Sequence, residues 1–573
     1  MLKKSFVFLM LIIFALLCYF SQTSKSVTVD EFVHFPSGIY NLKTLDWRMD
    51  SAAPPLVKCF PALSTIFTHP KMETKLFHES SNTWSLGYSF MYLNQDRYKS
   101  IFTYGRCMII LLGLLLGVLI YRWGREIYGY KGALFALLLY AFNPNILAHS
   151  SLTTIDIGVS CMIFLSVYCL WKYLKIPNTF SIIVAGVTLG LAQLSKFTAV
   201  LLYPVYFLIL ISLCIMGAYK FKEERLNILK INFIKYSKEF LIITLISIFI
   251  INLGYLFSNS FKPLHEYNFS SSLFNNFFSL IWSGLPVPLP YDYLTGFDSQ
   301  LAQSAGGRPF YVSYLMGEHS LSGWWYYYII AFLVKNPVSL PIILLLSVMV
   351  WLKIRTGKID IITSLCIWLP AISYFIYFSF FTHTPMGIRY LLPVFPFLFL
   401  ASGYLFSESI TKFKSMKYIL AFLTISYVSS AFLAFPHYLS YFNIASGGSE
   451  KGYRWLIESN LDWGQDLPGL KKYMDKNNIK EVKLGYFGRV DPGIYGINYS
   501  LAEKEPKEGI YAISINYLVG RPYYILDNRV KELKDVDLNY FNAYRRLDPV
   551  AIVGNTIYIF VVKKIADDAA NAK

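Results

Sequence analysis

Residues 101–121 read IFTYGRCMIILLGLLLGVLIY, and Arg106 is the only charged residue among them. A run of about 17 to 25 apolar residues is long enough to cross the hydrocarbon layer of a bilayer as a helix. Lipid offers the backbone no hydrogen-bond partner, so such a run is expected to be helical rather than extended. This stretch therefore predicts a membrane-spanning helix.

Similar runs recur along the chain and predict a polytopic α-helical membrane protein with about eleven spans. Of the 573 residues, 55% are hydrophobic and only 15% are charged, which is more apolar surface than a soluble core needs. The first run follows Lys3 and Lys4 and lacks a small-residue cleavage site, so we expect it to be an uncleaved span. The predicted spans lie near 6–20, 101–121, 132–148, 156–174, 179–194, 197–217, 239–257, 325–352, 361–381, 390–406 and 417–436.

The formal net charge is +17, from 52 Lys+Arg and 35 Asp+Glu, but the basic residues fall in short clusters between the apolar runs. No basic groove or recognition module accompanies them, which argues against a nucleic-acid partner. Basic loops favour the cytoplasmic side, so we expect the N-terminus to be cytoplasmic. The predicted cytoplasmic clusters are Arg122/Arg125, Lys172/Lys175, 220–238, Lys353/Arg355/Lys358 and Lys412/Lys414/Lys417.

An odd number of spans then places the C-terminal tail outside the cytoplasm of an inner or plasma membrane. We expect a membrane module, 1–436, with long outer loops at 21–100 and 258–323, followed by an extracytoplasmic α/β domain, 437–573. The large loops and the tail share one face, so we expect the chemistry there. In the tail, the pattern predicts a helix near 465–477, strands at 482–487, 510–517 and 551–562, and a hairpin at Gly554-Asn555.

Three acidic residues lie on this predicted outer face. Asp30 and Glu31 follow the first span by about ten residues, and Asp156 lies at the mouth of the fourth span. Helix capping is one explanation for acidic residues at such positions. The alternative is a cavity or a charged partner, because a carboxylate at the start of an apolar helix is otherwise costly.

Basic residues occupy the same face at Arg106, Lys196, Lys335 and Arg389. Each one singly is explained by a side chain that reaches the membrane interface, whereas several together indicate an anion site. A carboxylate that accepts a proton, combined with cations that stabilise a departing phosphate, is the set required to transfer a sugar from a lipid phosphate.

Several segments resemble the GT-C glycosyltransferases, and within them the bacterial relatives of the protein O-mannosyltransferases and of the aminoarabinose transferase of lipid A. No single segment is diagnostic, and the resemblance depends on their order along the chain. The matching segments are 30–34, 54–58, 147–156, 189–197, 254–257, 314–318, 323–327, 387–393 and 459–467.

The resemblance implies catalytic roles for Asp30, for its neighbour Glu31 and for the second acidic position, Asp156. It also implies, together with the cations above, a substrate-binding set, in which Asp462 and Gln465 suit sugar binding or simply a helix cap. Relatives commonly carry His before the two prolines, where this chain has Ala53. The predicted substrate-binding residues are His34, Lys58, Arg106, Lys196, Arg389, Asp462 and Gln465.

These features predict an inverting glycosyltransferase that uses a polyprenyl-phosphate-linked sugar and a hydroxyl of a protein, lipid or glycan. A lipid-linked sugar transporter or flippase is the alternative, and a non-catalytic sugar-binding scaffold is a third reading. Transporters usually show repeated halves and broken spans, and here only Lys335-Asn336-Pro337 is a strong break. We assign no metal ligands and no certain cofactor, and a divalent metal stays open.

Overall fold

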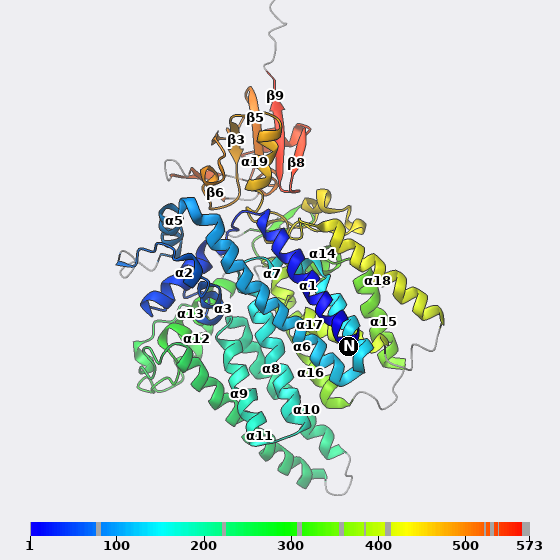
Figure 1. Ribbon diagram of the computed structural model, residues 1–573. Helices are drawn as coiled ribbons and strands as arrows, with labels where there is room; N and C mark the ends of the chain where they lie inside the picture. Colours follow the sequence, from blue (N-terminus) through cyan, green and yellow to red (C-terminus); the bar gives the residue numbers. More distant parts are fainter. Residues whose placement is uncertain are drawn as a thin grey trace, which may run out of the picture.

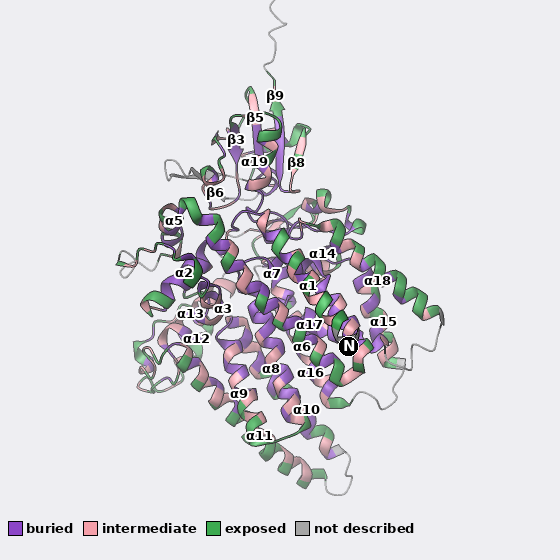
Figure 2. Cartoon of the chain, viewed as in Figure 1, coloured by how far each residue is buried: buried purple, intermediate pink, exposed green. Residues whose placement is uncertain are grey.

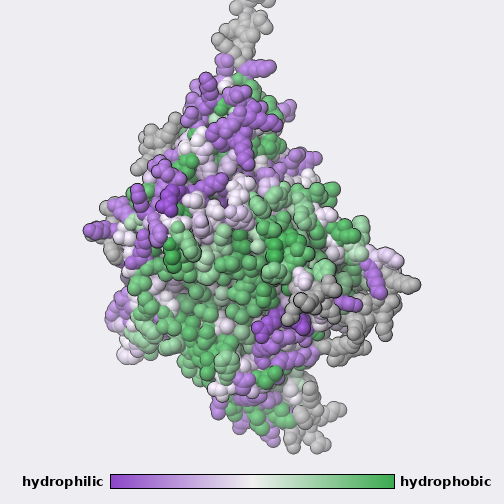
Figure 3. Space-filling model, in the orientation of Figure 1, coloured by the Kyte–Doolittle hydropathy of each residue, from purple (hydrophilic) through white to green (hydrophobic). Residues whose placement is uncertain are grey.

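The computed structural model describes residues 2–75, 82–219, 225–305, 312–353, 360–382, 385–406, 414–520, 523–527, 532–536 and 538–563. A large helical bundle carries a small β-sheet domain at one end (Figure 1). Buried residues fill the centre of the bundle and the sheet (Figure 2), and hydrophobic residues cover the visible side of the bundle, whereas the β-sheet end is mostly hydrophilic (Figure 3). This distribution agrees with a bundle immersed in lipid.

Within the described residues, seven helices are long and apolar enough to cross a membrane. A further pair of helices, α14 (Tyr327–Lys335) and α15 (Ser339–Lys353), is apolar enough when taken together and is bent by 110° at the predicted Lys335-Asn336-Pro337 break, as in a broken span or a re-entrant loop. The predicted multi-span membrane protein is therefore confirmed. The seven helices are α1 (Leu2–Thr23), α6 (Tyr98–Ala141), α8 (Asp156–Lys175), α10 (Leu202–Tyr219), α11 (Arg225–Gly254), α16 (Ile361–Phe380) and α18 (Lys414–Ala434).

The count differs from eleven for identifiable reasons. The predicted run 101–121 lies within α6. The run 132–148 begins in the same helix, beyond a break at Gly129, whose φ is 75°, and ends in α7 (Pro144–Ser150). Two others form helices shorter than a full span, namely α9 (Thr179–Gln193) and α17 (Phe395–Ser402), which continues as a 3-10 turn to Phe406. Of the basic loop residues, Lys220, Arg355, Lys358 and Lys412 lie outside the described residues, and the sidedness of the membrane stays a prediction.

Short helices form the two long loops. The first loop contains α2 (Glu31–Thr44), α3 (Pro55–Ala62), α4 (Thr65–Thr68) and α5 (Thr83–Leu93). The loop after α11 contains α12 (Ser272–Phe278), α13 (Tyr291–Ala305) and the antiparallel strands β1 (Ser313–Leu315) and β2 (Glu318–Ser320). A further short helix, α7 (Pro144–Ser150), connects α6 to α8.

The tail forms the predicted α/β domain. Its helix α19 (Leu467–Lys476) accompanies a five-stranded sheet of order β4-β3-β5-β9-β8, in which the β8–β9 hairpin turns at Gly554-Asn555 as predicted. The strands are β3 (Val482–Gly485), β4 (Tyr499–Leu501), β5 (Gly509–Ser514), β8 (Ala551–Val553) and β9 (Ile557–Val562), with α20 (Ile515–Leu518) after β5 and a separate hairpin of β6 (Tyr523–Asp527) and β7 (Glu532–Val536).

The tail and the bundle are joined by buried cations. Lys25, just after α1, donates to Asp466 Oδ1 over 2.5 Å at the start of α19. Lys335, at the bend between α14 and α15, donates to the carbonyl oxygens of Leu439 (2.8 Å) and Asn460 (2.5 Å). Residues 437–466 are thus held against the top of the membrane module, and they supply part of the site described below.

Close packing of α2 on α3 depends on Gly38. A Cβ at this position would lie 1.9 Å from the carbonyl oxygen of Lys58. We expect Gly38→Val to lower the stability of the detergent-solubilised protein by about 1–3 kcal/mol or more, because overpacking forces the backbones apart. Thermal unfolding measures this, with Ser100→Ala on the exposed face of α6 as the control. Equal melting temperatures for Gly38→Val and the wild type would contradict this account of the α2–α3 packing.

Candidate active site

Two carboxylates and two cations meet where the first loop, the helical bundle and the tail converge. Arg389 Nη1 lies 2.6 Å from Asp30 Oδ2 and 3.6 Å from Asp156 Oδ2. Lys196 Nζ lies 2.8 Å from Asp156 Oδ1. Four predicted site residues from distant parts of the sequence are therefore one cluster of alternating charge, which we call the charge cluster.

Each member is placed at the end of a helix or in a turn. Asp30 directly precedes α2, but its side chain makes no capping hydrogen bond among the described residues. Asp156 is the first residue of α8, and its carboxylate contacts Lys196 rather than the helix backbone. Capping, the alternative explanation for both residues, is therefore not what holds these two side chains.

The turn that carries Arg389 is fixed by the tail. Gly387 has a φ of 90°, which favours glycine, and a Cβ there would meet Ser459 Oγ at 2.5 Å. The amide of Ile388 donates to Asn460 Oδ1 over 2.8 Å. The 3-10 turn η5 (Ile388–Leu391) is therefore placed by residues about 70 positions further along the chain.

Aromatic rings cover the two cations. The guanidinium of Arg389 lies 4.5 Å from the ring centroid of Trp463, and Lys196 Nζ lies 4.3 Å from that of Tyr390. Such contacts stabilise a cation that has lost part of its hydration. A ring contact occupies the face of the guanidinium, so the N–H groups at its edge stay available for hydrogen bonds. Among the described residues, Nη2 of Arg389 donates no hydrogen bond.

The charge cluster also contains uncommitted acceptors. Asp156 is fully buried, yet its Oδ2 has no hydrogen-bond partner within the described part of the chain. His149 Nδ1, 4.0 Å from this atom, is also unpartnered there. Buried polar atoms are normally satisfied, so this is a place for a water molecule or a polar group of a substrate.

Asp50, a carboxylate outside the charge cluster, holds His34 beside Asp30. His34 Nδ1 lies 2.7 Å from Asp50 Oδ2, and its Nε2 faces Asp30 Oδ2 at 3.9 Å. Burial lowers the pKa of His34, but Asp50 and Asp30 outweigh this effect and raise the pKa above its ordinary value. Lys58 Nζ donates to the carbonyl oxygens of Met49 and Asp50, so it fixes this loop and does not face a substrate.

Glu31 and Arg106 form a buried ion pair, and the roles predicted for them in catalysis and in substrate binding stay predictions. Glu31 is fully buried and accepts six hydrogen bonds from Thr28, Arg106 and Thr153. Burial raises the pKa of Glu31, but Arg106 and these hydrogen bonds outweigh it and lower the pKa. All five N–H groups of Arg106 are used by Glu31 and by the carbonyl oxygens of Gln22, Lys25 and Ser26. This pair connects α6 to the first loop and has no donor left for a phosphate.

Asp462 and Gln465 are likewise turned into the protein. Gln465 accepts from the amide of Trp463 and donates to the carbonyl oxygen of Leu461. Asp462 accepts from Ser514 and from the amide of Gly464, and burial raises its pKa to about 7. These contacts shape the turn that presents Trp463 to Arg389, and the sugar-binding roles predicted for both residues stay predictions.

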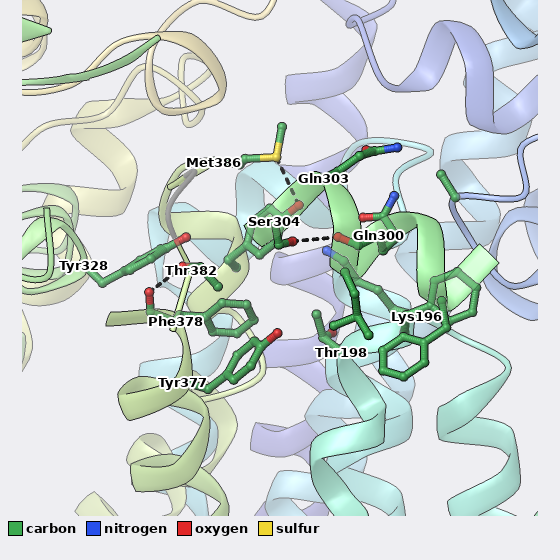
Figure 4. Close-up of a pocket in the computed structure, with 15 residues that line it drawn as sticks. Lys196, Thr198, Gln300, Gln303, Ser304, Tyr328, Tyr377, Phe378, Thr382 and Met386 are labelled. Carbon is green, nitrogen blue, oxygen red and sulfur yellow. Dashed lines mark hydrogen bonds between the residues drawn. The ribbon is translucent and has the colours of Figure 1, made fainter. Parts of the chain in front are cut away.

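A cavity opens beside Lys196. Side chains from α13, α16 and the turn before α10 face one another across it (Figure 4). Its polar lining includes Gln300 and Ser304 from α13 and Tyr377 from α16. Lys196 belongs to both the cavity wall and the charge cluster, and Tyr390, whose ring packs against Lys196, also lines the cavity. A molecule in the cavity therefore lies next to the charges.

The sequence predictions omitted Asp50, His149 and Trp463 as site residues. His149 and Trp463 lie inside segments that carry the family resemblance, and Asp50 lies between two of them. The contacts of these three side chains join residues that are far apart in sequence. The only signal for them in the sequence was therefore the residue type, since His, Asp and Trp are common in sites. Within the described residues, no group of three or more His, Cys, Asp or Glu side chains is arranged to hold a metal ion.

The family comparison covers part of this site. Residues 99–223 match the family model described as dolichyl-phosphate-mannose-protein mannosyltransferase. The matched segment contains Arg106, Asp156 and Lys196. The predicted resemblance to GT-C glycosyltransferases is thus confirmed for this segment, and no match is found among curated proteins.

Solved structures with a similar fold are distant in sequence. ArnT from Cupriavidus metallidurans bound to undecaprenyl phosphate is 13% identical, with a TM-score of 0.45 over 75% of this chain and 70% of that chain. The Archaeoglobus fulgidus oligosaccharyltransferase in the apo form is 12% identical, with a TM-score of 0.44 over 94% and 75%. The S. cerevisiae protein O-mannosyltransferase Pmt1-Pmt2 complex bound to the sugar donor is 18% identical, with a TM-score of 0.32 over 45% and 34%.

The structural account of Arg106 is testable by Arg106→Met. Removal of one partner of a buried ion pair leaves an uncompensated charge and costs about 3–5 kcal/mol, so we expect little folded protein. Arg48→Met is the matched control, because Arg48 is 55% exposed in its pair with Asp46 and such pairs contribute about 0–1 kcal/mol. Detergent-solubilised yield and thermal unfolding measure both. A stable Arg106→Met protein that had lost only donor binding would restore the substrate-binding role.

Proposed function

We propose that this membrane protein is an inverting glycosyltransferase that moves a sugar from a polyprenyl phosphate to a hydroxyl group at the non-cytoplasmic face. The observation that carries the proposal is the charge cluster beside the cavity. Arg389 contacts Asp30 and Asp156, and Asp156 also contacts Lys196. The family match over residues 99–223 supports the same class of donor. The acceptor is a hydroxyl of a protein, a lipid or a glycan.

Asp30 is the best placed general base in the charge cluster. Its side chain is 24% exposed, whereas those of Asp156 and Glu31 are 0% exposed. Arg389 contacts Oδ2 of Asp30, and among the described residues the other oxygen, Oδ1, accepts no hydrogen bond. This oxygen is therefore available to take the proton from an acceptor hydroxyl.

Arg389 and Lys196 are the groups proposed to hold the donor phosphate. Arg389 has an unused N–H edge, and Lys196 has ammonium protons beyond the one that Asp156 accepts. Fixed cations at a leaving phosphate stabilise the charge that develops in the transition state. Asp156 contacts both cations and thereby keeps them at a set separation.

The proposed step is a single displacement. The acceptor oxygen forms a bond to the anomeric carbon, and its proton passes to Asp30. The bond from this carbon to the phosphate oxygen breaks, and its electron pair stays on the polyprenyl phosphate. The Asp50–His34 pair is proposed to orient Asp30, since His34 Nε2 faces the same Oδ2 that Arg389 binds.

Asp30→Asn tests the base directly. We expect transfer from a labelled polyprenyl-phosphate sugar to fall by roughly 10²- to 10⁴-fold, because the amide cannot accept the proton. Asp46→Asn is the matched control, as Asp46 lies in the same loop and pairs with the exposed Arg48. The measurement uses purified protein and a panel of donors. Full activity of Asp30→Asn would eliminate Asp30 as the base, and absence of transfer by the wild type from every donor would favour the flippase alternative.

Arg389→Lys tests the phosphate contact. Lysine keeps the positive charge. Unlike arginine, it has no planar guanidinium that could contact Asp30 with one edge and the donor phosphate with another. We expect kcat/KM for the donor to fall roughly 10- to 100-fold, as for the loss of a charged hydrogen bond. Arg454→Lys, at an exposed position of the tail, should leave kcat/KM unchanged. A wild-type kcat/KM in Arg389→Lys would contradict the assignment.

A further inference from the structure

The loop that follows α11 presents an apolar stripe to the outside. Leu273, Phe277 and Leu280 follow one another at spacings of four and three residues, so they lie on one face of α12 and its extension. Phe277 is 57% exposed, Leu280 is 86% exposed and the nearby Trp282 is 73% exposed. These four residues, called the α12 stripe, form an exposed apolar surface of the kind that marks a contact with another phase or partner.

The adjacent face of α12 supplies the packing of the loop. Phe274 is buried, and Phe278 packs with Phe269 at a ring-centroid separation of 4.9 Å. Asn275 and Asn276 are exposed between the two faces. The α12 stripe is thus not needed for the internal core of the loop, and it is the second apolar face of a short amphipathic segment.

The end of α11 and the residues that follow it, in the same loop as the stripe, also expose apolar side chains. The last turns of α11 and the residues after it expose Leu253, Leu256, Phe257 and Phe261. Figure 1 shows α12 at the side of the bundle, farther from the β-sheet domain than α2 is. The lipid that surrounds α11 can therefore also cover the stripe, and no other partner is needed.

We propose that the α12 stripe lies in the bilayer interface and anchors the loop to the membrane. Aromatic residues, and Trp in particular, favour the boundary between headgroups and acyl chains, and an apolar helix face binds there by burial of its surface. The leaflet is the one on the side of the tail, because Met316 N of the same loop donates to Trp455 O.

The anchor is connected to the cavity wall. Asp298 of α13 accepts from the amides of Ser270 and Ser271, which precede α12. The rings of Phe274 and Phe297 lie 5.6 Å apart, and Phe297 lines the cavity. Membrane contact at α12 is therefore transmitted to the helix that carries Gln300 and Ser304, and this consequence rests on the proposed function of the cavity.

Fluorescence quenching in vesicles tests the anchor. Leu280→Cys and Trp282→Cys are labelled with an environment-sensitive fluorophore and reconstituted into phosphatidylcholine–phosphatidylglycerol vesicles that carry nitroxide in the headgroup or the acyl chain. Lys451→Cys, exposed on the tail, is the aqueous control, and Ser279→Cys is the control on the side of α12 turned away from the stripe. Wild-type protein labelled in parallel measures the signal from native cysteines.

We expect blue-shifted emission and strong quenching by shallow acyl-chain nitroxide at 280 and 282, weaker quenching at 279 and none at 451. Quenching at 280 and 282 that did not exceed the value at 451 would overturn the proposal. The result is independent of sugar transfer, so failure of the proposed function and failure of the anchor are distinguishable. If transfer is detected, Leu280→Asp should raise the KM for the donor, whereas Ser279→Asp should not.

Discussion

Arg389 is the residue on which the arrangement of the site depends. Its guanidinium contacts the carboxylates of Asp30 and Asp156 and lies over the ring of Trp463, so it joins the first loop, a membrane helix and the tail at one point. A buried guanidinium is costly unless it has charged and hydrogen-bonded partners. Because those partners come from separate segments, the cation is stable only where all three segments have assembled.

The tail is therefore a structural part of the membrane module. Lys25 binds Asp466, and Lys335 binds the carbonyl oxygens of Leu439 and Asn460. These ties hold the segment that precedes α19 at the mouth of the bundle, where Asn460 positions the turn of Arg389. The buried cations Lys25 and Lys335 thus fix the segment between the membrane module and the tail domain, so that this segment forms part of the site.

Two adjacent carboxylates illustrate how surroundings decide chemical capacity. Asp30 and Glu31 differ by one methylene and one position in the chain, yet Glu31 is saturated by six hydrogen bonds, whereas Asp30 is partly exposed with one oxygen uncommitted. A carboxylate with every lone pair occupied cannot accept another proton without breaking those bonds. Glu31 therefore fixes the position of the loop, and Asp30 is the carboxylate that we propose as the reactive group.

The sequence by itself determined that the chain is a multi-span helical membrane protein with an α/β tail, because lipid burial and strand alternation are local properties of composition and spacing. It also indicated Asp30, Asp156, Lys196 and Arg389 as charges needing partners. Only the tertiary structure decided which charges pair. Arg106 and Gln465 proved to be used internally, and Asp50, His149 and Trp463 joined the site, because these contacts link residues distant in sequence and no local pattern encodes them.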